Sequence, residues 1–109
     1  MTTITIVKSL DDEYRMVESK GHAGFADYGE DIVCSAISVL TINTVNSLDR
    51  LTDDKFELFT DEDKGIIRMY FHSPVSSDAE LLLKSFELGI RSIYEQYGKK
   101  FLNIKFRRE

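Results

Sequence analysis

The sequence predicts an α+β fold in which two helices pack on one mostly antiparallel sheet. Five segments alternate apolar and polar residues as strands do, and two longer segments repeat apolar residues every three or four positions as helices do. These elements follow the order ββαββαβ, which is typical of a two-layer sandwich. A length of 109 residues is that of one ordinary domain, so we expect a single domain over residues 1–109.

The strand pattern is clearest at the N-terminus, where Ile4 and Ile6 alternate with threonines. An acidic turn at 10–13 separates this segment from the second strand. The third and fourth strands are expected to form a hairpin around a polar turn at 60–64, and Pro74 ends the fourth. The five expected strands span residues 3–8, 14–20, 55–59, 65–72 and 101–106.

The first helix is expected from Asp31 to Asp49, with Asp27 and Asp31 as possible caps. Further apolar residues widen its apolar face, so we expect it to be buried on most sides, inside the fold or against a partner. A second helix is expected to begin at a capping box that starts with Ser77 and to end before Gly98. The residues of the first helix's main apolar face are Val33, Ala36, Ile37, Leu40, Thr44 and Leu48. Those that widen it are Ile32, Val39 and Val45.

Composition argues against several protein classes. The net charge of −5 is unfavourable for direct nucleic-acid binding, which needs a basic surface. One cysteine cannot form an intramolecular disulfide, the N-terminus lacks the pattern of a signal peptide, and we see no apolar run of membrane-spanning length. We therefore expect a cytoplasmic protein without membrane partners. With two histidines and one cysteine there is no zinc spacing, so no metal or cofactor is expected.

One pair of residues could carry chemistry, namely Cys34 and His22. Cys34 is expected in the first turn of the first helix, where the helix dipole stabilises a thiolate and free N–H groups could form an oxyanion hole. His22 lies on a glycine-containing loop that could fold back and take the thiol proton. A lone cysteine in an apolar helix is more often a core residue, however. On spacing alone, a reactive pair and a core cysteine behind an ordinary loop both remain open.

The residues around this pair resemble the ribosomal-processing cysteine protease (Prp) family. The resemblance is carried by G-H-A at 21–23 and by Y-G-x-D-I-V-C-x-A-x-S at 28–38. It implies a cytosolic, homodimeric cysteine endopeptidase that removes a short N-terminal extension from a bacterial large-subunit ribosomal protein. Cys34 matches the family's nucleophile and His22 its general base. Two other readings stay open: a non-catalytic ribosome-associated binding module, and a thiol redox sensor.

Five neighbouring residues are candidates for binding or supporting roles. Asp31 and Ser38 match the family motif and share a helix face with the cysteine, so they could anchor the loop and contact a peptide, or simply begin the helix and permit close packing. Gly21 allows a close backbone approach beside the histidine. Phe25 and Tyr28 could contact substrate from a loop that opens and closes, or could only cover the core.

Overall fold

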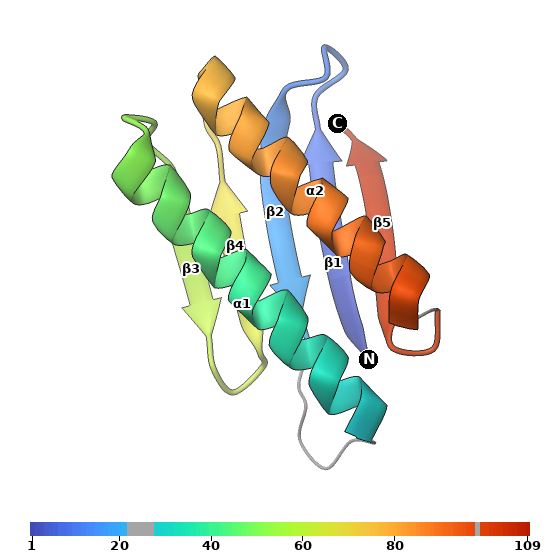
Figure 1. The fold of residues 1–109 in the computed structure, drawn as a ribbon. Helices are drawn as coiled ribbons and strands as arrows, with labels where there is room; N and C mark the ends of the chain where they lie inside the picture. The colour runs from blue at the N-terminus through green and yellow to red at the C-terminus, as the bar shows by residue number, and fades with distance from the viewer. Residues whose placement is uncertain (22–27, 98) are drawn as a thin grey trace.

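The computed structural model describes residues 1–21, 28–97 and 99–109 and shows a two-layer sandwich. One five-stranded sheet is covered on one face by both helices (Figure 1). The order ββαββαβ and the α+β class are confirmed. The elements are β1 (Thr2–Lys8), β2 (Tyr14–Lys20), α1 (Tyr28–Leu51), β3 (Glu57–Asp61), β4 (Ile66–Tyr70), α2 (Ser77–Tyr97) and β5 (Leu102–Arg108).

The sheet has the strand order β3-β4-β2-β1-β5 and is mixed. Three neighbouring pairs are antiparallel, as expected, whereas β1 and β5 run parallel. Their register extends from Thr2 opposite Leu102 to Lys8 opposite Arg108. Parallel neighbours need a long crossover, and here nearly the whole chain supplies it. The arrangement leaves β3 at one edge of the sheet, next to α1 (Figure 1).

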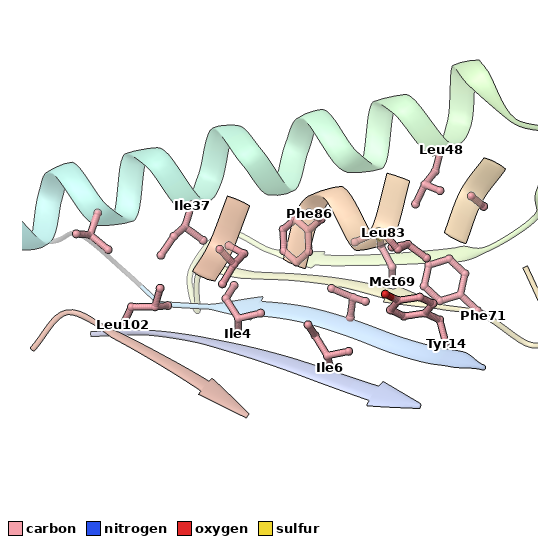
Figure 2. Packing of buried hydrophobic residues seen from close by; sticks show 14 residues of the cluster. Ile4, Ile6, Tyr14, Ile37, Leu48, Met69, Phe71, Leu83, Phe86 and Leu102 are labelled. Carbon is pink, nitrogen blue, oxygen red and sulfur yellow. The ribbon is translucent and has the colours of Figure 1, made fainter. Parts of the chain in front are cut away.

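The core lies between the sheet and the two helices, and α1 enters it along a single face. Figure 2 shows Ile37 and Leu48 of α1 pointing toward the sheet, with Phe86 and Leu83 of α2 beside them. Thr41 is also fully buried, and its hydroxyl donates to the carbonyl of Ile37 at 2.7 Å, so this hydroxyl has a hydrogen-bond partner. Within residues 31–51 of α1, the buried residues are Val33, Ile37, Thr41, Thr44 and Leu48.

The structure refines two expectations about α1. The helix runs from Tyr28 to Leu51, three residues earlier and two residues later than expected, and the fold itself does not bury it on most sides. Val39 is 69% exposed and Ile42 is 49% exposed, because the core covers only the face that looks onto the sheet. Apolar residues outside that face therefore remain available for other contacts.

The start of α2 also differs from the expected capping box. The cap is Ser76, whose hydroxyl oxygen accepts the N–H of Ala79 at 3.1 Å. Asp54, 22 residues earlier, holds this serine by accepting its backbone N–H at 2.7 Å and its hydroxyl at 2.5 Å. The cap thus lies one residue before Ser77, because a partner distant in sequence selects the serine that is used.

By length and composition, one described helix could cross a membrane, contrary to our expectation. It is the segment Asp31–Leu51 of α1, with a mean hydropathy of 1.3. Its buried face packs in the core, and the core helices of soluble proteins meet the same criterion.

Candidate active site

A cleft of about 540 Å³ runs between α1 and the β3–β4 hairpin. The α1 wall is formed by one row of side chains: Cys34, Ser38, Ile42, Val45 and Asn46. These residues follow at intervals of three or four positions along the helix, apart from the last, so they lie on one side of it. With a rise of 1.5 Å per residue, the wall is roughly 18 Å long, which equals about five residues of extended peptide.

The opposite wall comes from β3, β4 and the turn between them. Its apolar part includes Leu58, which is half exposed, and Ile66 and Ile67. Its polar part includes Asp61 and Glu62, the only charged residues that line the cleft in the part of the chain described here. The cleft therefore combines an apolar lining with negative charge.

Cys34 lies in this cleft and is not a core residue. It is partly exposed, whereas the core positions Val33 and Ile37 on either side of it are 1% exposed. Ser38 follows one turn later and lines the same cleft, so the structure brings these two predicted site residues together. A thiol in such a position is accessible to a bound peptide.

The expected surroundings of Cys34 need one correction. Because α1 begins at Tyr28, Cys34 lies in the second turn of the helix and not in the first. Its N–H is then bonded to the carbonyl four residues earlier, and the dipole effect is concentrated in the first turn. The backbone around Cys34 is therefore not a free oxyanion hole, and donors for an oxyanion must come from other groups.

Gly21 joins the cleft from the end of β2, where Thr2 and Ser19 also line it. A side chain at Gly21 would collide with neighbouring backbone, since a Cβ atom would lie 2.8 Å from the Cα of Thr2. This close approach agrees with the role expected of the glycine. His22, the predicted base, follows Gly21 directly in the sequence.

The remaining predicted site residues are placed only in part. His22 and Phe25 lie outside the described residues, and Tyr28 is the first residue of α1. Asp31 is partly buried in α1, and its Oδ1 atom is buried without a hydrogen-bond partner among the described residues. An unpaired buried carboxylate oxygen is unusual and indicates that a donor is to be expected nearby.

Sequence reasoning missed the hairpin wall, including Leu58 and Gly65, and also missed Ile42. The signal for Ile42 was present, because it lies four residues after Ser38 on the same helix face. No local signal marks the hairpin residues, since only the tertiary fold brings them to α1. The second histidine, His72, does not line this cleft; its Nε2 lies 3.2 Å from Glu57 at an exposed site.

Known proteins share this sequence and fold. The family model described as cysteine protease Prp matches residues 1–102. The ribosomal processing cysteine protease Prp of Bacillus subtilis (strain 168) is 31% identical over 103 residues, which cover 89% of this chain and 90% of that protein. The protein of the same name from Staphylococcus aureus (strain Mu50) is 28% identical over 105 residues, covering 94% and 99%.

A solved structure gives the same result. The essential ribosomal processing protease Prp from S. aureus, in complex with a substrate peptide, superposes with a TM-score of 0.86 at 25% identity over the full length of both chains. The family resemblance predicted from the His-loop and Cys-helix motif is thereby confirmed. The chain belongs to the Prp family and is a cysteine protease.

Proposed function

We propose that this protease removes the N-terminal extension of a bacterial large-subunit ribosomal protein, with Cys34 as nucleophile and His22 as general base. The observation that carries the proposal is that Cys34 lines a cleft together with Gly21, the residue directly before His22. The names of the relatives, which are ribosomal processing proteases, support the substrate class.

The proposed reaction follows from the chemistry of a thiol and an imidazole. His22 takes the thiol proton, and Sγ of Cys34 attacks the scissile carbonyl carbon. The C–N bond breaks as the imidazolium donates its proton to the leaving amine. Water, deprotonated by His22, then hydrolyses the thioester and releases the enzyme. No cofactor is required for any of these steps.

Supporting roles are assigned to the other predicted residues. The Ser38 hydroxyl, one turn from the thiol, hydrogen-bonds the peptide in the cleft. Asp31 anchors the segment that carries the base, which would give its buried Oδ1 a donor. Phe25 and Tyr28 contact apolar residues of the extension.

The lining of the cleft supports a basic, extended substrate. Ile42, Val45 and Leu58 offer apolar contacts to an extension, while Asp61 and Glu62 attract positive charge. Ribosomal proteins bind RNA phosphates and are rich in lysine and arginine for that reason. A peptide of about five residues would follow the α1 wall.

The test is to incubate the protein with ribosomal proteins that carry N-terminal extensions and to measure product masses. Cys34→Ala and His22→Ala should each abolish cleavage and leave thermal unfolding unchanged. Ser35→Ala is the matched control, because Ser35 is an exposed helix neighbour that does not line the cleft. Cleavage at the wild-type rate by either site variant would overturn the mechanism.

The same experiment separates the alternatives. If Cys34→Ser binds the extended protein normally and the wild type never cuts it, the chain is a binding module. Reversible oxidation of Cys34 that changes assembly or activity would indicate a redox sensor.

We further propose one cytoplasmic domain over residues 1–109 that acts as a homodimer. Exposed apolar side chains on both helices support a partner: Val39 is 69% exposed, and Leu81 and Leu88 are each 68% exposed. Sedimentation should show a dimer at micromolar concentration. A monomer alone at that concentration would contradict the proposal.

A further inference from the structure

The β3–β4 turn holds the end of β2 by a contact between two backbones. The N–H of Gly21 donates to the carbonyl of Gly65 at 3.0 Å, and the N–H of Gly65 donates to the carbonyl of Glu62 at 3.2 Å. Gly65 has a φ of +63°, a conformation that residues with side chains seldom adopt. The turn and the end of β2 are therefore joined without any intervening side chain.

The space at Gly65 does not admit a side chain. A Cβ atom there would overlap the carbonyl oxygen of Gly21 and would lie 2.9 Å from its carbonyl carbon. Since carbon atoms in contact are about 3.5–4.0 Å apart, the two backbones would have to separate by on the order of 1 Å. The backbone of Thr2 is also close to Gly21, since a Cβ atom added at Gly21 would lie 2.8 Å from the Cα of Thr2.

This contact lies one peptide bond from the proposed base. Consecutive Cα atoms are about 3.8 Å apart, so a displacement of Gly21 moves the point from which the chain continues toward the proposed base. Gly21 and Gly65 both line the cleft that contains Cys34. A displacement of about 1 Å at a catalytic group can lower a rate by roughly 100-fold.

We infer that Gly65 is a positioning residue for the proposed base: by holding Gly21, it keeps the residue directly before His22 at the cleft that contains Cys34. The inference rests on the proposed function, since it needs His22 to be the base. The β3–β4 turn then contributes to the reaction through this contact, although it supplies no group to the chemistry itself. Gly65 acts only through Gly21 and does not itself touch the reacting atoms.

The test uses Gly65→Ala with Gly89→Ala as the matched control. Gly89 lies on α2, and a Cβ atom there would meet only the flexible end of the Leu40 side chain, 2.6 Å from its Cδ2. We expect Gly65→Ala to lower kcat by roughly 30- to 100-fold on an extended peptide with KM changed less than about threefold. Gly89→Ala should change neither constant by more than about threefold.

The decisive readout is the alkylation rate of Cys34, the single cysteine of the chain, by iodoacetamide as a function of pH. If Gly65 acts through His22, Gly65→Ala should slow alkylation near neutral pH as His22→Ala does. The double variant should be no slower than His22→Ala alone. Equal additional slowing in the His22→Ala background would show that Gly65 acts independently, and the inference would be wrong.

Folding is controlled by a second variant, Gly65→Asn, since asparagine tolerates positive φ better than alanine but still carries a Cβ atom. It should retain more stability than Gly65→Ala and lose activity equally. Full activity in a folded Gly65→Asn protein would also overturn the inference. A failure of the proposed function gives another result, because the His22→Ala variant would then still cleave the substrate.

Discussion

The apolar side chains of the cleft allow a quantitative prediction about substrate binding. Ile42 is 49% exposed and Leu58 is 50% exposed, on opposite walls. Burying a whole side chain of this size stabilises by about 1.5–3 kcal/mol, so covering the exposed half is worth roughly 0.8–1.5 kcal/mol. Truncation to alanine keeps the Cβ atom and should forfeit about 0.5–1 kcal/mol at each position. The double variant should lose roughly 1–2 kcal/mol, or about 5- to 30-fold in kcat/KM.

The assay is steady-state cleavage of a fluorogenic peptide that carries the extension. The loss should appear in KM with kcat nearly unchanged, because these contacts bind the ground state and the transition state equally. The matched control is Leu10→Ala with Leu51→Ala, two side chains that are 82% and 70% exposed and do not line the cleft. If both double variants raise KM equally, or neither does, the peptide does not lie where we propose.

Three further predictions follow from other contacts. Asp61→Asn with Glu62→Gln should raise KM for a basic peptide about 3- to 10-fold at 0.05 M salt and much less at 1 M, where the charges are screened; an effect unchanged by salt would contradict this. Asp54→Ala should cost about 1 kcal/mol, or about 4 °C in Tm. Hydrogen bonds from Ser76 hold the pKa of Asp54 below its ordinary 3.8. The stabilisation by Asp54 is therefore present above pH 3.8 and is lost as the pH falls through the lower pKa of the folded state. A Tm difference between Asp54→Ala and wild type that grows in acid would refute this. Phe86→Ala, at a site 1% exposed, should cost about 3–5 kcal/mol in urea unfolding, and Phe86→Leu less than half of that; equal losses would mean that the cavity does not set the cost.

The sequence predicted the element order well because each element has its own local pattern. The alternation of Ile4 and Ile6 and the helical spacing of Val33, Ile37 and Leu48 are visible without the fold. Periodicity does not distinguish a cleft from the core, however. The sequence predicts that Val39 widens an apolar surface, and only the position of the sheet shows that Val39 and Ile42 remain exposed.

Features that depend on distant segments could not be predicted. The cap of α2 was placed at Ser77 because the local spacing fits, whereas Asp54 selects Ser76. The structure brings the motif residues Cys34 and Gly21 to one cleft, whereas the motif gave no sign of the hairpin wall. Gly65 is 44 residues from Gly21 in the sequence, and nothing near it marks the contact.

The parallel pairing of β1 with β5 has a consequence for folding during synthesis. β1 is made first and lies inside the sheet, but its second neighbour is the last strand to leave the ribosome (Figure 1). Contacts of such sequence separation form slowly and cannot form on an unfinished chain. Until Leu102–Arg108 has emerged, one side of β1 has no strand beside it. We therefore expect a nascent chain truncated before Leu102 to be protease-sensitive and inactive, so that activity begins only after β5 has been made.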